Sequence, residues 1–459
     1  MTNAEPRIAD NGSRYGVKRK SGKNSALITI VKAAPSAAPA ETPINPGSAS
    51  GFLKRPCKHA PDIDKAAPTT AAKRTLGKRI LTKTSSSKVV RLPVKYFKTE
   101  KINWKQVQKD GIQRGIKTRK NWDQKWYHVM NQPVIKNIFK KQPVLTFENP
   151  FTIKPILKEK LDNYPTSLQK PGEELAWKYL KSFCKKRGAD YSKNISKPQD
   201  SRASCGRISP YLSWGNISTR QAVQFIKSHP NYEFNKRSFN AILTRLKWRD
   251  HFIQKFEVEC DYESRCINKG FESLSYKNHE NLILAWEKGT TGFPLIDASM
   301  RCLIKTGWIN FRMRAMLVSF LCHHLDCSWK LGVYHMAKIF LDYEPGIHYT
   351  QFQMQAGTTG INTVRIYNPI KQSKDHDPDG IFIKKWVEEL TDVPKEFIHE
   401  PWMMTEMDKV FYELNYNYKK PIINLKDSGK LARAKIWGHR KYRKVKLENR
   451  RIIVTHTRQ

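Results

Sequence analysis

The chain has 459 residues, enough for two to four domains at about 100–200 residues each. It carries 83 Lys and Arg against 41 Asp and Glu, a formal net charge of +42, together with 12 Trp. This aromatic content excludes wholesale disorder, and no apolar run reaches the roughly 18 residues of a membrane span. The excess of cations favours a soluble protein with a polyanionic partner, nucleic acid being the first candidate.

The positive charge is concentrated at the two ends of the chain. Residues 1–150 have a net charge of +22 and residues 419–459 one of +12, whereas 151–418 hold only +8. We therefore expect a disordered basic tail over 1–120, a lead-in segment over 121–150, a globular domain over 151–418 and a basic C-terminal extension over 419–459. The tail is compatible with a solvated segment, a nucleic-acid-binding arm or a targeting signal.

The elements expected along the globular part are helices. Pro294 suits a first helical turn and Gly307 a helix end. Alternating strand patterns are scarce, and no glycine-rich strand–turn–helix fingerprint occurs, so we expect an all-α core. Apolar residues at helical spacing predict helices over 219–228, 236–256, 294–307, 312–326 and 381–390, and a basic helix, packed or free, within 431–451.

The spacing of the eight cysteines does not indicate a disulfide framework. No C-x-x-C pair occurs, no Cys/His group has the spacing of a zinc site, and most cysteines lie within apolar patterns. The sequence predicts reduced, buried thiols in an intracellular protein and no metal site.

Two loops contain more polar and charged residues than packing alone would require. Residues 201–212, SRASCGRISPYL, place small hydroxyl residues and Gly before a helix, which suits a phosphate or simply caps the helix. Residues 341–349, LDYEPGIHY, combine two carboxylates and a His, and an acid/base site, a cation site and a cofactor clamp all remain open. Arg312 and Arg314 cannot share a helix face, so we expect one of them to turn inward toward a carboxylate such as Asp342.

Several specific motifs follow one another between residues 207 and 402. Residues 285–301 read AWEKGTTGFPLIDASMR, which resembles the W-x-x-G-x-T-G-[YF]-P-[LIV]-[VI]-D-A-x-M-R signature of photolyases and cryptochromes. Residues 207–218 read RISPYLSWGNIS and resemble a second motif of that family, R-[LI]-S-P-[YW]-L-x-x-G-x-[IL]-S. RIYNP, DPDG and HEPW follow in order. The resemblance covers the family's helical flavin domain, at about 150–440.

The resemblance implies an all-α domain that binds FAD in a folded form and uses light to repair DNA. In such repair, the reduced flavin passes an electron to a pyrimidine dimer, the cyclobutane ring opens and the electron returns. The implied cofactor-binding residues are Tyr191, Ser204, Arg207, Ile208, Ser209, Arg249, Arg314, Asp342, Glu344 and His348. The implied DNA contacts are Arg245, Trp248, Trp286 and Arg312, and the implied catalytic residues are His348, Trp248, Trp286 and Trp329.

The sequence departs from the family pattern at positions that the resemblance places at the flavin, at the DNA or in the electron-transfer chain. Arg245 stands where repair enzymes have a Glu, and His348 stands where they have an Asn. The tryptophan chain that reduces flavin matches at Trp286 and Trp329, but its third position is Phe352. Cys205-Gly206 replaces Thr-Ser, and Phe311 replaces an Asn. Residues 1–150 lack the strand–helix alternation of the family's antenna domain, which we expect to be missing.

Three functions therefore remain open from the sequence. The first is a light-dependent lyase that repairs pyrimidine dimers in damaged duplex or single-stranded DNA, acting as a monomer. The second is a cryptochrome-like photoreceptor, which Arg245, His348 and Phe352 favour. The third is a DNA-binding flavoprotein without photochemistry. All three imply FAD, no membrane and an intracellular location, with nucleus, organelle and bacterial cytoplasm left open.

Overall fold

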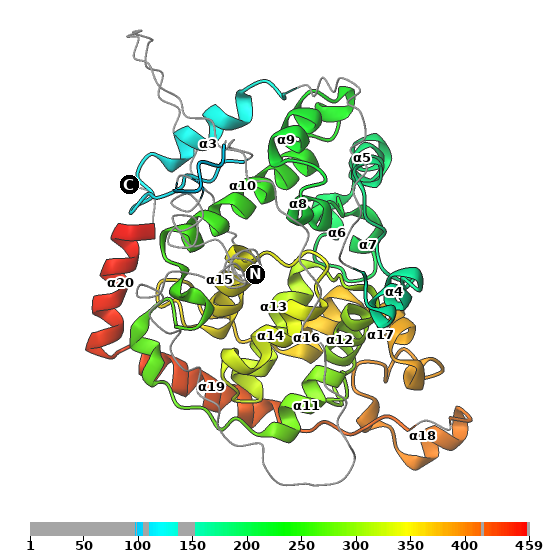
Figure 1. The fold of residues 1–459 in the computed structure, drawn as a ribbon. Coiled ribbons are helices and arrows are strands. Elements are labelled where there is room, and N and C mark those ends of the chain that lie inside the picture. Colours follow the sequence, from blue (N-terminus) through cyan, green and yellow to red (C-terminus); the bar gives the residue numbers. More distant parts are fainter. Residues whose placement is uncertain (1–96, 98, 104–109, 136–151, 415–416, 457–459) are drawn as a thin grey trace.

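The computed structural model describes residues 97, 99–103, 110–135, 152–414 and 417–456. Within these ranges all regular structure is helical and no β-strand occurs, which confirms the expected all-α class (Figure 1). No helix in the described part is long and apolar enough to cross a membrane. Residues 1–96, most of the predicted tail, lie outside the described residues.

The helices of the first half, except α4, surround one hydrophobic core, here called the upper core. Trp122, Trp126, Phe183, Phe239 and Trp308 are among its buried side chains. The helices of the first half are α3 (Trp122–Asn131), α4 (Pro155–Asp162), α5 (Glu173–Ser182), α6 (Tyr191–Asn194), α7 (Ser201–Ser204), α8 (Ser209–Trp214), α9 (Thr219–Lys227) and α10 (Lys236–Val258), with a π-helical turn at Phe183–Arg187 and a 3-10 turn at Pro230–Tyr232.

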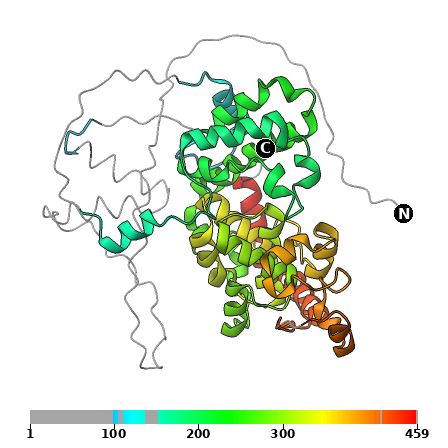
Figure 2. The ribbon, with the colours of Figure 1, turned by 90° about the vertical axis from the view of Figure 1, so that its right-hand side faces the viewer.

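The second half forms a separate lower core around Trp286, Met313 and Trp329. Figure 2 shows the green helices of the first half above the yellow-to-red helices of the second. These later helices are α11 (Glu280–Lys288), α12 (Pro294–Thr306), α13 (Phe311–Ser319), α14 (Trp329–Ile339), α15 (Pro345–Ala356), α16 (Pro369–His376), α17 (Ile381–Trp386), α18 (Glu406–Phe411), α19 (Leu425–His439) and α20 (Arg443–His456). Short helical turns lie at Cys260–Glu263, Lys269–Ser273, Phe320–His324, Glu388–Leu390 and Pro401–Met403.

The predicted helices are confirmed, with three changes. The basic stretch 431–451, expected to hold one helix, is divided between α19 and α20. α12 begins at Pro294, and Gly307 follows it with a φ of 65°, the left-handed conformation that glycine adopts without strain. The expected helix over 312–326 changes from α to π geometry at Phe320. The expected helix over 381–390 ends at Trp386 and gives way to a 3-10 turn. The seven described cysteines are free and six are buried, as predicted.

The ends of the described chain pack against the core more closely than expected. Gly111 N–H donates to Asp250 Oδ2 at 3.3 Å, and Arg119 Nη1 donates to the carbonyl of His456 at 2.7 Å. Arg119 is only 1% exposed, so residues 110–120 do not belong to a solvated tail. Their ordering is explained by long-range partners that no local pattern reveals. The C-terminal extension is also packed, as helices α19 and α20.

Candidate functional site

An open cleft of about 260 Å³ lies where the upper and lower cores meet. Its walls come from α6, the loop before α8, α10, and the starts of α13 and α15. The segments are far apart in sequence, but α10 packs against both α9 and α15 and so joins the two halves (Figure 1). The cleft brings together nine residues predicted from the sequence, namely Tyr191, Arg207, Ile208, Ser209, Arg245, Trp248, Arg249, Arg314 and Asp342.

The loop before α8 approaches the cleft with its backbone. A Cβ on Gly206 would lie 2.8 Å from Ile242 Cδ1 of α10, so a larger residue there would require the Ile242 side chain to move. Arg187 Nη1 holds the loop by donating to the carbonyls of Ala203 at 2.5 Å and Cys205 at 2.6 Å. Ser204 does not line the cleft, because its hydroxyl donates to a carbonyl one helical turn earlier.

Arg207 is a buried cation on the wall of the cleft. Its guanidinium lies 4.1 Å from the centre of the Trp308 ring, and Nη2 donates to Gln169 Oε1 at 3.0 Å. Burial and, to a smaller extent, the neighbouring Arg202 together lower the pKa of Arg207 to about 10. Its Nε is buried without a partner, and Arg207 forms no ion pair within the described part of the chain. Such a group favours an anion.

Arg314 and Asp342 form an ion pair at the inner end of the cleft. Arg314 Nη2 lies 2.8 Å from Asp342 Oδ2, which confirms the expected inward arginine. The second carboxylate oxygen, Oδ1, is buried without a partner. Because buried acceptors are nearly always hydrogen-bonded, Asp342 Oδ1 is suited to accept from a molecule bound in the cleft. Arg312 does not line the cleft and lies instead against the Tyr367 ring at 5.7 Å.

Arg249 connects the cleft to the N-terminal segment. Its Nη1 donates to Asp250 Oδ1 at 2.9 Å, and its Nη2 lies 3.7 Å from Glu344 Oε2. Asp250 is fully buried and accepts a hydrogen bond from Trp126 Nε1 at 2.9 Å. Burial raises the pKa of Asp250 to about 6 against the opposing effect of Arg249. The sequence did not predict that Asp250 and Trp126 belong to this site. The only local indication was that Asp250 directly follows Arg249.

His348 lies beside a smaller inner cavity of about 50 Å³ that shares Arg314 and Asp342 with the cleft. Its Nε2–H donates to the carbonyl of Val333 at 2.8 Å. Burial lowers the pKa of His348 to about 4, so the imidazole is neutral near pH 7 and Nδ1 is an acceptor. Phe352 lines the same cavity, with its ring centre 5.6 Å from that of His348.

The four predicted tryptophan and arginine contacts to DNA divide into two groups. Trp248 is 43% exposed at the cleft, with the Arg245 guanidinium 4.7 Å from its ring centre. Trp286, by contrast, is fully buried and donates to the carbonyl of Leu317, so the expectation that it contacts DNA is wrong. The physical reason is Gly332 on α14, whose missing side chain leaves room for the indole.

Trp329 is also buried and distant from the cleft lining. Its Nε1 donates to Cys266 Sγ at 3.4 Å within the lower core. Neither Trp329 nor Trp286 lines the cleft or the inner cavity. Any part that they take in electron transfer would therefore run through the interior of the protein.

Comparison with known proteins identifies the part of the chain from α10 to α19. Residues 242–438 match the FAD binding domain of DNA photolyase. The deoxyribodipyrimidine photo-lyase of Alkalihalophilus pseudofirmus is 36% identical over 257 residues, 55% of this chain and 53% of that protein. The enzyme of the same name from Buchnera aphidicola is 31% identical over 337 residues, 70% and 67% of the two chains. Cryptochrome DASH of Synechocystis is 30% identical over 54% of this chain and 49% of that protein.

Solved structures show the same fold. A class III photolyase from Agrobacterium tumefaciens superposes with a TM-score of 0.56 at 24% identity, over 63% of this chain and 60% of that one. A Synechocystis cryptochrome superposes with a TM-score of 0.54 at 25% identity, over 58% of this chain and 56% of that one. The chain spans about half to two thirds of the length of the relatives described here.

FAD is the cofactor of the matched domain, and the residues of the cleft fit it. FAD brings a pyrophosphate anion, for which Arg207 offers an unpartnered N–H, and a flavin ring with an N–H, for which Asp342 offers an unpartnered oxygen. Ser209, at the start of α8, and Arg249 add further donors to the same wall. From these motifs, the fold and its relatives, the chain belongs to the photolyase/cryptochrome family.

Proposed function

We propose that this chain is a light-driven DNA-repair lyase that splits pyrimidine dimers. The observation that carries the proposal is the cleft, which has an exposed tryptophan, Trp248, on its wall and two unsatisfied groups, Arg207 Nε and Asp342 Oδ1, within it. When bound, FAD supplies the light absorption and the electron that opens the cyclobutane ring.

The residues of the cleft have separate tasks in this proposal. Trp248 offers an aromatic face on which an extruded dimer stacks; extrusion costs little for a base that is already poorly stacked. Arg245, held over that ring, places a cation next to the dimer or its phosphate. Arg314, oriented by Asp342, and the neutral His348 line the inner cavity and would hold the flavin there. The substrate is damaged duplex or single-stranded DNA, and the protein acts as a monomer inside the cell.

A second candidate is a cryptochrome-like photoreceptor without repair activity. The buried Phe352 supports it, because phenylalanine is much harder to oxidise than the tryptophan found at this position in the family. Arg245 supports it too, since a cation replaces the carboxylate that contacts the dimer in repair enzymes. A DNA-binding flavoprotein without photochemistry is the third candidate.

Illumination of the FAD-loaded protein with dimer-containing DNA under reducing conditions tests the proposal. We expect dimers to disappear only in the light, and Trp248→Ala to reduce this loss at least tenfold. Trp437→Ala, at a half-exposed tryptophan on α19, is the matched control and is expected to leave repair unchanged. Flavin binding without light-dependent loss of dimers would exclude the lyase and leave the photoreceptor and the non-photochemical flavoprotein.

The salt dependence of DNA binding tests the role of Arg245. If Arg245 contacts a phosphate, Arg245→Ala will lower the slope of log K against log salt by about 0.9. The control is Arg237→Ala, on the first turn of α10 and outside the cleft lining. An unchanged slope in the Arg245 variant would remove this residue from the DNA contact.

A further inference from the structure

Three tyrosines in mutual contact lead from the inner cavity to the surface of the protein. Tyr343, in the loop between α14 and α15, lines the inner cavity. Its hydroxyl donates to the hydroxyl of Tyr349 on α15 at 3.2 Å, and Tyr349 is only 1% exposed. The ring centre of Tyr349 lies 6.2 Å from that of Tyr334 on α14, which is 46% exposed. Because α14 and α15 pack against each other, the three phenol rings form a continuous path.

Tyr343 is the oxidisable aromatic side chain of the inner cavity. Among the described residues that line this cavity, it is the one tyrosine, and none is a tryptophan or a cysteine. Phe352, which stands where the family has a tryptophan, is much harder to oxidise. An oxidised cofactor bound in this cavity would therefore find its readiest electron donor in Tyr343.

The tryptophans on the wall of the outer cleft are less suited to give up an electron. The Trp308 ring centre lies 4.1 Å from the Arg207 guanidinium, and that of Trp248 lies 4.7 Å from the Arg245 guanidinium. A cation over an aromatic ring is attracted to the electrons of that ring, so it opposes the positive charge that oxidation creates there. Oxidation of either indole is therefore disfavoured.

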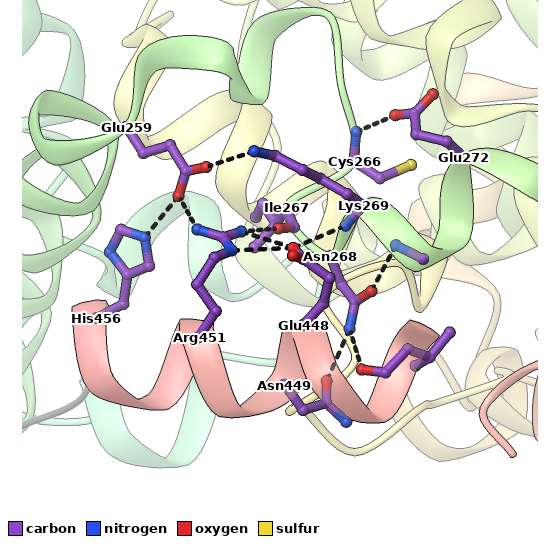
Figure 3. A network of polar contacts seen from close by, with 12 residues as sticks. Glu259, Cys266, Ile267, Asn268, Lys269, Glu272, Glu448, Asn449, Arg451 and His456 are labelled. Carbon is purple, nitrogen blue, oxygen red and sulfur yellow. Dashed lines mark hydrogen bonds and ion pairs between the residues drawn. The ribbon is translucent and has the colours of Figure 1, made fainter. Parts of the chain in front are cut away.

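Oxidation of a tyrosine releases its hydroxyl proton, and the two inner phenols are placed to pass that proton on. Burial raises the pKa of Tyr343 to about 12 and also raises the pKa of Tyr349, so both are protonated near pH 7. The charge of the Glu263 carboxylate contributes to both increases, which places this base near the pair. Glu259, at the start of the same helical turn, is instead engaged with Arg451 of α20 (Figure 3). Glu263 is therefore the carboxylate that serves the two tyrosines.

We propose that Tyr343, Tyr349 and Tyr334 carry electrons from the surface to FAD, in place of the family's tryptophan chain. First, Tyr343 gives one electron to photoexcited, oxidised FAD, and one phenol proton passes through Tyr349 to the Glu263 carboxylate, which leaves a neutral tyrosyl radical. Tyr349 then restores Tyr343 by giving it an electron and a proton across their hydrogen bond, and Tyr334 restores Tyr349 in the same way. At the surface, a thiol in solution gives a hydrogen atom to Tyr334, and two of the resulting thiyl radicals combine to a disulfide. The proposal rests on FAD binding and light absorption but not on DNA repair.

Flash photolysis of the FAD-loaded full chain, with dithiothreitol and without DNA, tests this route. We expect transient absorption and electron paramagnetic resonance to show a neutral tyrosyl radical after the flash, rather than a tryptophanyl radical. Tyr343→Phe should abolish this radical and slow light-driven reduction of bound FAD at least tenfold. Tyr349→Phe and Tyr334→Phe should keep the first radical but shorten its lifetime, because the radical can no longer move away from FAD.

Tyr442→Phe, at an exposed tyrosine between α19 and α20, is the matched control and should keep both the radical and the rate. FAD affinity, measured in parallel, separates a loss of the route from a loss of the site and should stay within twofold of wild type. If Tyr343→Phe fails to hold FAD, the radical lifetime in Tyr349→Phe decides.

A tryptophanyl radical in the wild type would overturn the proposal. So would a rate unchanged in Tyr343→Phe together with a radical lifetime unchanged in Tyr349→Phe, or the absence of light-driven reduction of bound FAD. The loss of dimers is measured separately with FAD that is already chemically reduced, so failure of the tyrosine route and failure of the proposed repair function are distinguishable.

Discussion

The ion pair between Arg314 and Asp342 makes the sharpest prediction about the flavin site. Asp342→Asn keeps the shape of the side chain but removes its charge, so Arg314 loses the partner that lies 2.8 Å from its Nη2. Both side chains are mainly buried, at 25% and 5% exposed. A hydrogen bond between charged groups contributes about 1.5–3 kcal/mol. If the pair serves to orient Arg314 toward FAD, this corresponds to roughly 10- to 140-fold weaker FAD binding.

Titration of the apoprotein with FAD, followed by flavin fluorescence, measures this change. Denaturant unfolding of the apoprotein, measured in parallel, separates an effect on the site from an effect on the fold. Asp427→Asn, at an exposed carboxylate of α19, is the matched control and should leave FAD affinity unchanged. FAD affinity within twofold of wild type in both Asp342→Asn and Arg314→Ala would refute the reasoning, whatever the effect on stability.

Three further predictions concern pH, the N-terminal segment and photoreduction. Burial lowers the pKa of His348 to about 4 in the folded protein, against about 6.5 in the unfolded chain. Its contribution to the free energy of unfolding, at most roughly 3 kcal/mol, is therefore present in full above pH 6.5 and is lost as the pH falls toward 4. His348→Gln should make the free energy of unfolding depend less on pH between about 4 and 6.5. Trp126→Phe removes the indole donor from a buried carboxylate and should lower the free energy of unfolding by about 2–3 kcal/mol, as measured with denaturant. Phe352→Trp should speed light-driven reduction of bound FAD, because an indole is much easier to oxidise than the phenyl ring that lines the inner cavity.

Each of these predictions has its own control or contrary outcome. His279→Asn, at an exposed imidazole, should leave the pH profile as it is, and an unaltered slope in the His348 variant would contradict the assignment. Trp437→Phe, at a half-exposed tryptophan, should cost far less stability than Trp126→Phe. An unchanged photoreduction rate in Phe352→Trp would mean that electrons already reach the flavin by another path.

The sequence predicted the helical class and most of the cleft, because both depend on local patterns. Helix geometry predicted that one of Arg312 and Arg314 turns inward, the family resemblance indicated Arg314, and its pairing with Asp342 is confirmed. The signature at 285–301 identified the family, but in this fold it mainly supports a turn. Asp297 in that signature accepts from Thr291 N at 2.8 Å, from Gly292 N at 3.0 Å and from the hydroxyl of Tyr418 at 2.6 Å.

What the sequence missed depends on contacts between distant segments. Asp250 is surrounded by groups from Gly111, Trp126 and Thr219, none of which is a neighbour in the chain. Trp286 was expected near DNA because its position in the motif was known and its burial was not. Burial depends on the packing of α11 against α14, where Gly332 has no side chain, and no pattern within either helix specifies that contact.

The hydrogen bond from Arg119 to the carbonyl of His456 has a consequence for synthesis of the protein. It joins residues 337 positions apart, so the segment before α3 cannot reach its final position until α20 has left the ribosome. A nascent chain interrupted within α19 would hold the FAD-binding helices but lack the helix that covers Arg119 and Glu259. The segment before α3 therefore takes its final position only after α20 has been made, and removal of α20 would first disturb the packing of Arg119 near the opposite end of the described chain.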